Sequence, residues 1–580
     1  EEIEYLPAWE EEKHVITSAS VEINEDGYIA EERIPLRKTG RFFSGSRDLV
    51  EYIDVTPTQL VGAAASTVPF LSHNDQNRAL MAANMSRQAV PLIKPEAPIV
   101  GTGLEEDLAK NSGAMVLARE KGTVTYVDGN TIRVETKDGT DEYELSKFRK
   151  SNNDTCLNHT PRVLVGDKVK KDDVLADGSS TDHGELALGT NLNIAYVSFK
   201  GLNYEDAFVV SRRLVEEDLL TSIHIAEYET SVLETKLGPE QVTRDIPNVS
   251  ADALRNLGED GIVALGSEVD AGDILVGKIA PKGESELSAE ERLLRSIFGE
   301  RARDVRDNSL RMSHGDYGTV VGIKVLTDEN SDLEPGVLRT IQVRVAQRRK
   351  LQVGDKLVGK HGNKGVVSAI LPEEDMPFME DGTTVDIIMS SCSVISRMNT
   401  GQLLETHLGA AGYKLGKKYA IPPFSKFDPE LLKKELEEAD LPRDGKRTLY
   451  DGYTGEPLEQ KVVVGQAYIL KLEHLVEDKM HARSTGPYAL ITQQPLGGKA
   501  QFGGQRFGEM EVWALEAFAA ADMLHEMLTI KSDDIVGRGR AYKALIQGEE
   551  IPGPTQPESF KLLIRELNGL GLNIEAVAEK

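Results

Sequence analysis

Alternating apolar and polar residues predict β-structure in several short stretches of the chain. Residues 122–127 and 131–135 alternate in this way on either side of a short polar turn. A second turn, at Asp26-Gly27, also separates two short apolar stretches. A half-buried strand places successive side chains on opposite faces, so each of these pairs predicts a hairpin.

Two helices are expected between these β-regions. Residues 56–59, Thr-Pro-Thr-Gln, have the pattern of a capped helix start, and Pro69 ends that helix. A second helix is expected over residues 74–88, where it carries Arg78 and Arg87. The alternative for both arginines is a solvated helix surface.

One segment of the β-region occurs twice. Residues 166–175, Gly-Asp-Lys-Val-Lys-Lys-Asp-Asp-Val-Leu, return at residues 266–275 as Gly-Ser-Glu-Val-Asp-Ala-Gly-Asp-Ile-Leu. Two copies do not make a solenoid, which needs three or more repeats, so they predict two related small β-units. These units resemble the barrel-sandwich hybrid folds of biotinyl and lipoyl carriers. Neither copy is followed by the modified-lysine hairpin of a carrier, which excludes that function.

Length and composition limit the class of protein. A chain of 580 residues is too long for one core and predicts about four domains. The longest apolar run, residues 60–71, is too short for a membrane span and contains Gly62 and Pro69. Cys156 and Cys392 are too few for a disulfide framework or a thiolate zinc site, which suits a reducing cytoplasm.

The termini and the charge add two expectations. The N-terminus is acidic, without the basic region of a signal peptide, and it starts with Glu, so we expect a fragment or a processed product. The net charge of −28 argues against a general nucleic-acid coat, because nonspecific binding depends on cationic contacts with phosphate. Residues 356–364 and 479–508 nevertheless carry several cations and no acid, which predicts an internal path for phosphate groups.

The strongest candidate site is the stretch at residues 354–365, Gly-Asp-Lys-Leu-Val-Gly-Lys-His-Gly-Asn-Lys-Gly. Its glycines allow close approach to a ligand, and Lys356, Lys360 and Lys364 can converge on phosphate. The stretch begins like an ATP-binding loop, but His361 stands where that motif needs a magnesium-binding Ser or Thr. We therefore reject an ATPase loop. The alternative to a phosphate site is a lysine-bearing turn between two strands.

A second candidate is the pair Glu205-Asp206, at the edge of the apolar run of residues 207–210. Two adjacent carboxylates can share a divalent cation with a triphosphate. A solvated acidic turn is the commoner use of such a pair.

A short helix is expected over residues 288–299. Its apolar residues fall on one face: Leu293, Leu294, Ile297 and Phe298. Packing inside their own domain and docking of a partner helix are the two alternatives.

The longest motif covers residues 481–508, a Gly- and Gln-rich loop that begins at His481. A loop of this length is usually functional or disordered. The strongly apolar helix expected behind it, residues 509–530, argues against disorder.

Four blocks of the chain together resemble the β subunit of bacterial DNA-dependent RNA polymerase, roughly its C-terminal half. They are Asn203-Tyr-Glu-Asp, the lysine–glycine stretch, Ser396-Arg-Met-Asn and the loop from His481, and they occur in the order of that family. The resemblance implies a mixed α/β multidomain fold: a double-psi β-barrel with barrel-sandwich hybrid β-units, a flap domain and C-terminal helices that contact the β′ clamp. The implied domains are 1–50, the end of an external domain; 51–105, a helical segment near the active centre; 106–222, a hybrid-binding β-region; 223–350, the flap; 351–508, the completion of the barrel with the switch loop; and 509–580, the C-terminal helices.

The resemblance also implies roles around the nucleotide. Lys356 and Lys364 match lysines that face the RNA 3′ end and the initiating nucleotide, and Glu205 and Asp206 match an acidic pair beside the second Mg²⁺. Arg87 and Arg397 match arginines near the triphosphate, and His481 matches a histidine near the initiating nucleotide.

Further implied contacts concern nucleic acid and partner proteins. Lys360, Lys499, Gln505 and Arg506 are expected to contact nucleic acid, and the apolar face at residues 293–298 is expected to dock a sigma factor. The principal Mg²⁺ belongs to the β′ subunit, whose Asn-Ala-Asp-Phe-Asp-Gly-Asp motif is missing from this sequence. The implied partners are β′, the α dimer, omega and sigma, with template DNA, nascent RNA and nucleoside triphosphates, in the nucleoid of the cytoplasm and without a membrane.

The sequence departs from the family pattern at three places. Lys360 stands where Arg is usual, Phe199 where Trp is usual, and residues 391–395 replace the usual Leu-Gly-Val-Pro before Arg397. Two other classes of function stay open from the residues alone. One is a binding scaffold without triphosphate contacts, which nucleotide crosslinking to Lys356 would distinguish from a polymerase subunit. The other is a free-standing nucleotide hydrolase, which a phosphate-release assay would detect.

Overall fold

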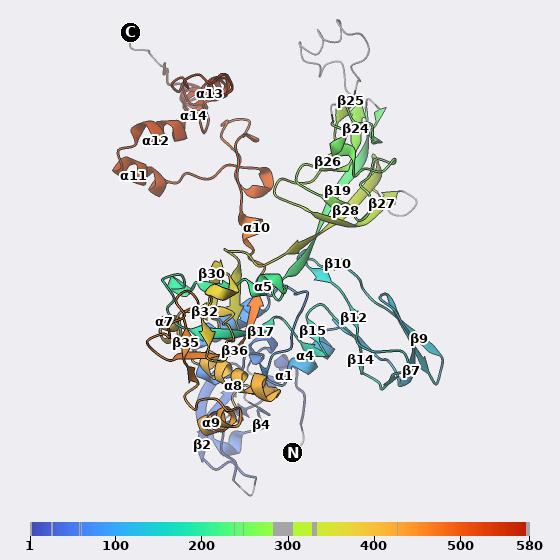
Figure 1. Ribbon diagram of the computed structural model, residues 1–580, viewed down its shortest axis with the longest axis vertical. Helices are drawn as coiled ribbons and strands as arrows, with labels where there is room; N and C mark the ends of the chain where they lie inside the picture. The colour runs from blue at the N-terminus through green and yellow to red at the C-terminus, as the bar shows by residue number, and fades with distance from the viewer. Residues whose placement is uncertain are drawn as a thin grey trace. The chain divides into compact units, whose positions relative to one another are not determined.

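The computed structural model falls into two compact units, residues 1–476 and 477–580 (Figure 1). The structure describes residues 3–24, 27–56, 59, 61–236, 238–247, 249–281, 305–327, 333–425 and 427–575. The expected helix with Leu293, Leu294, Ile297 and Phe298 lies outside the described residues, and its docking role stays a prediction. The turn expected at 26–27 falls partly outside them as well.

The second unit begins at residue 477, so residues 477–508 group with the C-terminal helices. The sequence analysis placed these residues in the barrel domain, and all its domain boundaries stay predictions.

Six strands of the first unit close into a barrel. Their order is β17, β32, β18, β30, β29 and β36, and β36 pairs back onto β17. The pairs β17–β32 and β18–β30 are parallel, and the other pairs are antiparallel. The strand bounds are β17 Thr190–Tyr196, β18 Phe208–Ser211, β29 Lys356–Gly359, β30 Lys364–Leu371, β32 Ile387–Met389 and β36 Val462–Lys471.

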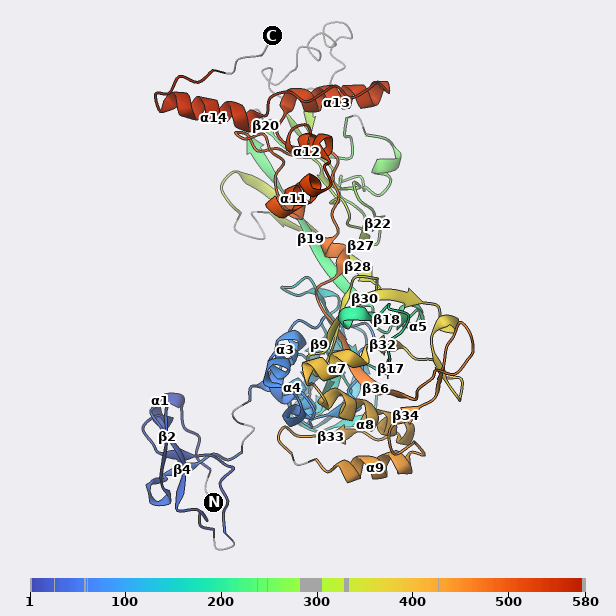
Figure 2. The same ribbon diagram turned by 90° about the vertical axis from the view of Figure 1, so that its left-hand side faces the viewer.

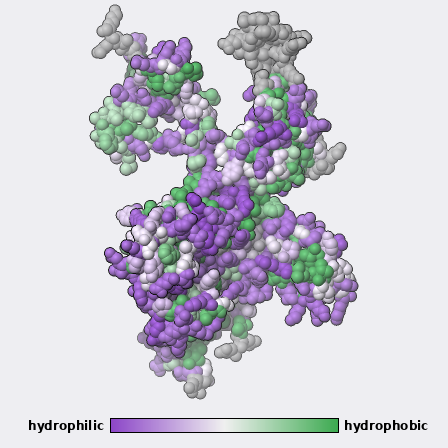
Figure 3. Space-filling model, viewed as in Figure 1, coloured by the Kyte–Doolittle hydropathy of each residue, from purple (hydrophilic) through white to green (hydrophobic). Residues whose placement is uncertain are grey.

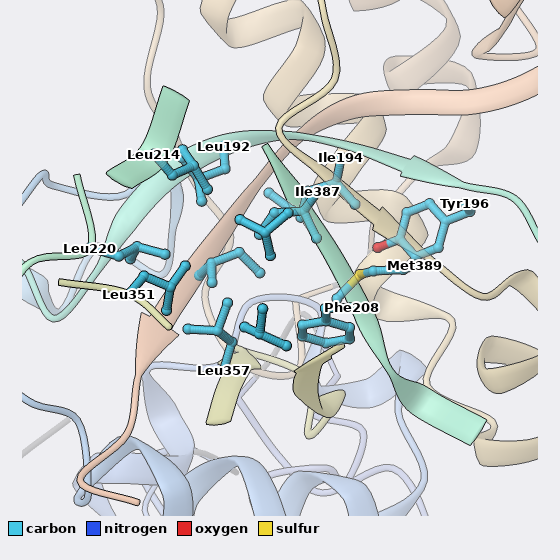
Figure 4. Packing of buried hydrophobic residues seen from close by; sticks show 14 of the residues in the cluster. Leu192, Ile194, Tyr196, Phe208, Leu214, Leu220, Leu351, Leu357, Ile387 and Met389 are labelled. Carbon is cyan, nitrogen blue, oxygen red and sulfur yellow. The ribbon is translucent and has the colours of Figure 1, made fainter. Parts of the chain in front are cut away.

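The barrel is filled by side chains from these strands. Leu192 and Ile194 of β17, Phe208 of β18 and Ile387 of β32 belong to one buried apolar cluster, which Figure 4 shows from close by. A second apolar cluster contains the alternate residues Ala195, Val209 and Ile388, which are fully buried. A strand that is buried on both faces has a nearly continuous apolar sequence, which explains why residues 207–210 lack the alternation of a surface strand.

Helices and small strands cover the barrel. Helix α8 (Gly401–Leu415) packs on β36 at close range, because a Cβ on Gly409 would lie 2.2 Å from the carbonyl oxygen of Gln466. Helix α9 begins at Pro429, and the Asp428 carboxylate accepts a hydrogen bond from the amide of Glu430. The remaining elements here are α5 Arg213–Glu216, β31 Phe378–Met379, α7 Ser391–Arg397, β33 Tyr419–Ala420, α9 Pro429–Glu438, β34 Lys446–Arg447 and β35 Leu449–Tyr450.

The segments before the barrel form helices and a small sheet. The expected helix over 74–88 is confirmed as α3 (Gln76–Ser86), which Asp75 caps. The helix expected from residue 56 to Pro69 is much shorter, α2 (Ala63–Ser66), and residues 57, 58 and 60 lie outside the described part. The other elements are α1 Ala8–Glu11, β1 Ile16–Thr17, β2 Arg33–Lys38, β3 Arg41–Ser46, β4 Tyr52–Ile53, β5 Val100–Gly101 and α4 Glu105–Asn111.

The internal repeat forms two units with the same strand pairing. In the first copy, β13 (Lys168–Val169) pairs with β7 (Gly122–Val127) so that Val169 faces Gly122. In the second copy, β22 (Glu268–Val269) pairs with β27 (Gly318–Thr327) so that Val269 faces Gly318. Both copies have a bulge in the strand that follows, β14 (Val174–Asp177) or β23 (Ile274–Val276). The prediction of two related β-units is confirmed.

The two copies carry different neighbours. In the first copy the strands β8 Thr131–Thr136, β9 Thr140–Glu144, β6 Val116–Leu117, β10 Arg149–Lys150, β11 Cys156–Leu157, β12 Thr160–Pro161, β15 Thr181–Asp182 and β16 Glu185–Leu186 complete the region. In the second copy the long strands β19 (Ser222–Thr235) and β28 (Val337–Arg349) pair along their length. The short strands there are β20 Gly238–Pro239, β21 Gln241–Val242, β24 Lys278–Pro281, β25 Val305–Asp307 and β26 Leu310–Arg311.

The second unit is helical, and its single expected helix is broken. Instead of one helix over 509–530, the structure has α11 (Glu509–Ala517) and α12 (Ala521–Leu528), because Ala519 has a φ of 55°. The aspartates 533 and 534 cap α14 (Glu558–Gly569) and α13 (Ile535–Gln547), whose N-termini meet (Figure 2). The preceding elements are α10 Val476–Lys479 and the short 3-10 helix Lys499–Gln501.

Apolar side chains lie exposed on this second unit, where Figure 3 shows green patches over its helices. Met510, Trp513 and Phe518 are 72%, 54% and 84% exposed. Among the described residues, no helix has both the length and the apolarity to cross a membrane.

The repeat gives a paired stability prediction. Leu175 and Leu275 occupy the same register position and are both fully buried. Leu175→Ala and Leu275→Ala should each lower the free energy of unfolding by about 2 to 5 kcal/mol, because each leaves a similar cavity. Val165→Ser and Leu265→Ser, at equivalent positions 64% and 68% exposed, are the controls and should change little. Thermal unfolding of the four variants tests this, and controls that cost as much as the core substitutions would contradict it.

Candidate functional site

The lysine–glycine stretch forms a hairpin between two barrel strands. Strand β29 ends at Gly359, β30 begins at Lys364, and the amide of Gly359 donates to the carbonyl oxygen of Asn363 over 3.0 Å. A strand follows the turn where an ATP-binding loop needs a helix, in agreement with the rejection of that motif. Gly362 has a φ of 73°, and a Cβ there would lie 2.4 Å from the carbonyl oxygen of Arg78. Glycine at this position therefore lets α3 approach the turn.

The three lysines of the stretch have different surroundings. Lys364 is exposed and Lys356 is half-buried. Lys360 is only 8% exposed, and its ammonium lies 4.7 Å from the centre of the Tyr468 ring. Burial lowers the pKa of Lys360, whereas the negative charges of Glu405 and Glu105 raise it. The side chain of Lys360 thus points into the protein, and its expected contact with nucleic acid stays a prediction.

The acidic pair lies in a strained turn. Glu205 and Asp206 both have left-handed backbone conformations, with φ of 51° and 66°. Such conformations cost about 1 to 3 kcal/mol each and persist where the surroundings impose them. The buried Asn203 holds this turn, since its side chain accepts from the amide of Phe199 over 3.0 Å and donates to the carbonyl oxygen of Val197 over 2.6 Å.

Four charged side chains from distant parts of the chain line one small pocket. They are Arg78 of α3, Asp206, Lys364 of β30 and Arg397 of α7. The pocket holds about 20 Å³, which is room for about one water molecule. The Arg397 guanidinium donates to the Asp206 carboxylate. Polar neighbours complete the lining: Asn363, Ser390, Ser393, Asn399 and Gln402.

Arg78 is the residue that the sequence analysis did not select. It is 8% exposed and donates to the carbonyl oxygen of Gly362 over 3.2 Å. Burial lowers the pKa of Arg78, and the nearby Arg397 lowers it further. Arg87, the arginine that the family pattern suggested, is exposed and does not line the pocket. The two lie nine positions apart on or just after α3, a separation that places them on different faces of a helix.

The altered sequence before Arg397 forms a helix. Residues 391–397 make up α7, and Arg397 is the last residue of that helix. Ser393 of α7 and Ser390 before it line the pocket. Replacing the usual Leu-Gly-Val-Pro therefore leaves Arg397 directed at Asp206.

Not every expected site residue joins the pocket. Lys356 and Glu205 lie next to lining elements, on β29 and before Asp206, but do not line the pocket.

His474 follows β36, and its Nε2 lies 3.2 Å from the side-chain oxygen of Gln88. The amide of Leu472 donates to the carbonyl oxygen of Lys356 over 3.1 Å, so His474 lies at the end of the barrel where Lys356 begins its strand.

The cations of the second unit are arranged around a Gly-rich loop. His481 donates through Nε2 to the carbonyl oxygen of Gly503 over 2.7 Å. Lys499 donates to the carbonyl oxygens of Glu477 and Asp478 over 3.0 and 3.1 Å. Gln505 and Arg506 are exposed. A cavity of about 470 Å³ in this unit is lined by His481 and Gln505 together with Arg483, Tyr488, Lys531 and Arg538.

The carboxylates near the pocket suit only a metal ion that they share with a bound phosphate ligand. Among the described residues, no group of three or more His, Cys, Asp or Glu side chains is arranged to hold a metal. Glu205 and Asp206 supply two carboxylates, and Mg²⁺ is commonly held by one or two carboxylates together with substrate phosphates. The donor set therefore fits an ion that arrives with a triphosphate.

Comparison with known proteins identifies the class that this barrel and pocket define. Residues 117–501 match the family model of RNA polymerase Rpb2, domain 6, residues 503–579 match Rpb2, domain 7, and residues 1–56 match the RNA polymerase beta subunit external 1 domain. The chain belongs to the Rpb2 family of RNA polymerase β subunits, which confirms the resemblance.

Relatives named DNA-directed RNA polymerase subunit beta match along the whole chain. The protein from Acetivibrio thermocellus is 55% identical over 581 residues, 100% of this chain and 46% of that protein. Those from Chloroflexus aggregans and Clostridium novyi are 56% and 54% identical, over 100% of this chain and 47% of each relative. The chain thus spans about half the length of the curated relatives it matches.

The close approach at Gly362 yields a prediction. Gly362→Ala should cost more stability than Gly382→Ala, because both glycines have left-handed φ but only Gly362 meets another backbone atom within 4 Å. The left-handed conformation alone costs about 1 to 2 kcal/mol for a residue with a Cβ. Thermal unfolding measures both, and equal losses would show that the contact with Arg78 is unimportant.

Proposed function

We propose that this chain forms one side of the active centre of a DNA-dependent RNA polymerase, where it positions the incoming nucleoside triphosphate, the RNA 3′ end and the RNA–DNA hybrid. The observation that carries the proposal is the pocket with Arg78, Lys364 and Arg397 around one carboxylate. Three cations against one acid suit a polyanion. A scaffold that only binds other proteins gives no reason for this concentration of charge.

The closed barrel with two parallel strand pairs supports its assignment as a double-psi barrel. We also propose that residues 223–350 form the flap and dock a sigma factor through residues 293–298. In the proposed assembly, β′, the α dimer, omega and sigma are partners, and the complex acts on DNA in the cytoplasm.

The chemistry is nucleotidyl transfer, in which an RNA 3′-hydroxyl attacks the α-phosphate of the triphosphate. Mg²⁺, with its principal site on β′, stabilises the charge on the attacking and leaving oxygens when it is bound. Arg78, Arg397 and Lys364 would neutralise the triphosphate, and Asp206 with Glu205 would share the ion that accompanies it.

The remaining site residues have proposed roles around the nucleic acid. Lys356 would lie toward the RNA 3′ end. Exposed Lys499, Gln505 and Arg506 would track the nucleic acid, and His481 would contact the initiating nucleotide or fix the loop that does.

Removing a lysine tests the proposal. In the assembled polymerase, Lys364→Ala and Lys356→Ala should each raise the KM for the initiating nucleotide about tenfold, because a charge-assisted contact with phosphate contributes about 1 to 3 kcal/mol. Lys137→Ala, an exposed lysine in a hairpin turn, is the control. Initiation kinetics measure the effect. Unchanged kinetics in both variants would refute the assignment, and phosphate release from ATP by the chain alone would favour a hydrolase.

The ion pair in the pocket predicts that one substitution has opposite effects on nucleotide binding without and with Mg²⁺. A triphosphate must replace Asp206 as the partner of Arg397, so Asp206→Asn should strengthen binding of a metal-free triphosphate to the assembled polymerase. The same variant should raise the Mg²⁺ concentration needed for nucleotide binding, because one carboxylate is lost. Glu205→Gln, which leaves the ion pair intact, should show only the second effect. Binding of a fluorescent nucleotide with EDTA or with Mg²⁺ separates the two, and weaker metal-free binding by Asp206→Asn would contradict the proposed exchange.

A further inference from the structure

A buried chain of hydrogen bonds runs through His361, the residue that excluded an ATP-binding loop. The side chains of His361 and Glu405 are 1% and 3% exposed, and Nε2 of the ring lies 2.7 Å from Oε2 of the carboxylate. The other ring nitrogen, Nδ1, lies 3.0 Å from Nδ2 of Asn74. The Asn74 amide is oriented by the main-chain amide of Gly401, which donates to its Oδ1 over 3.2 Å.

These contacts fix the tautomer of the ring. The Asn74 nitrogen can only donate, so Nδ1 of His361 accepts this hydrogen bond. Nε2 therefore carries the ring proton and donates a hydrogen bond to Glu405. The second carboxylate oxygen of Glu405 accepts from the amide of Tyr468 over 3.2 Å. The hydrogen bonds from Asn74 through His361 therefore run toward Glu405, and the Asn74 side-chain nitrogen also donates to the carbonyl oxygen of Phe70 over 3.4 Å. No member of this network can turn without leaving a buried group unpaired.

The same turn holds three elements of the triphosphate pocket. Asn399, which lines the pocket, donates through its side chain to the carbonyl oxygen of His361 over 3.2 Å. Arg78 donates to the carbonyl oxygen of Gly362, and Lys364 begins the strand that follows. The packing is tight, because a Cβ on Gly401 would lie 2.8 Å from Asn74 Oδ1 and 3.0 Å from His361 Nδ1.

We propose that His361 is a positioning residue for nucleotide binding: between Asn74 and Glu405 it holds the turn at 360–363 so that Arg78, Lys364 and Asn399 face one pocket. The inference rests on the proposed function, since the charged side chains around the pocket are taken to bind the triphosphate. His361 itself lies too deep to touch the nucleotide, and its effect passes through Arg78 and Asn399, which donate to the turn, and Lys364, which follows it.

Breaking one hydrogen bond of this network is the first test of the role. In Glu405→Gln, the amide nitrogen of the introduced glutamine must face the donor of either Tyr468 or His361, so one buried hydrogen bond is lost. In the assembled polymerase we expect the KM for nucleoside triphosphate to rise about tenfold, with a smaller change in kcat and in template affinity.

A second substitution should reverse the loss. Adding Asn74→Asp to Glu405→Gln should restore the KM, because the His361 ring can then donate from Nδ1 to the introduced carboxylate and accept at Nε2 from the introduced amide. The other oxygen of the introduced carboxylate still accepts from the main-chain amide of Gly401. A role of His361 in packing alone would not predict this rescue.

Controls separate this inference from the proposed function. Glu437→Gln, an exposed glutamate on α9, makes the same chemical change and should leave the KM unchanged. If Lys364→Ala raises the KM and Glu405→Gln does not, His361 has no positioning role although the pocket does bind nucleotide. If neither Lys364→Ala nor Lys356→Ala has an effect, the proposed function itself fails. Should Glu405→Gln not assemble, the double variant decides: a wild-type KM supports the proposal, and a raised KM or failure to assemble overturns it.

Discussion

A close backbone contact sets the geometry of the whole site. A Cβ on Gly365 would lie 2.2 Å from the carbonyl oxygen of Asp206, so only glycine lets the acidic turn lie against strand β30. Gly362 in the same way makes room for the carbonyl oxygen of Arg78. Because both contacts are made by main-chain atoms, the side chains at 364, 206 and 78 are free to converge.

The charges at the site are balanced within the protein in two ways. Arg397 and Asp206 neutralise each other at the surface of the pocket, where a stronger anion can compete for the arginine. Lys360 is held inside, with Tyr468 over its ammonium and Glu405 and Glu105 favouring its charge. A net charge of −28 therefore coexists with a local excess of cations around this pocket.

Local patterns predicted much of the fold and part of the site. The strands around residue 130, helix α3 and the presence of two related β-units all followed from spacing and turn residues, which are properties of neighbouring positions. The burial of Lys360 did not follow, because it depends on Tyr468 and Glu405, which are distant in sequence. The choice between Arg78 and Arg87 depends on which face of α3 meets the turn at Gly362, and no periodicity of α3 alone shows that. The break at Ala519 needed a backbone conformation that alanine rarely adopts.

The two β-units of the repeat reach the same pairing by opposite routes. Strand β7 precedes β13 along the chain, whereas β27 follows β22, yet Gly122 faces Val169 just as Gly318 faces Val269. Gly166 and Gly266 even donate to equivalent carbonyl oxygens, of Val124 and Val320, both over 2.8 Å. The units are thus related like circular permutants: what specifies each is the set of facing residues, while the order of its covalent connections is free to change. A polypeptide built on this pattern can be opened at one turn and rejoined at another without altering the contacts that hold it together.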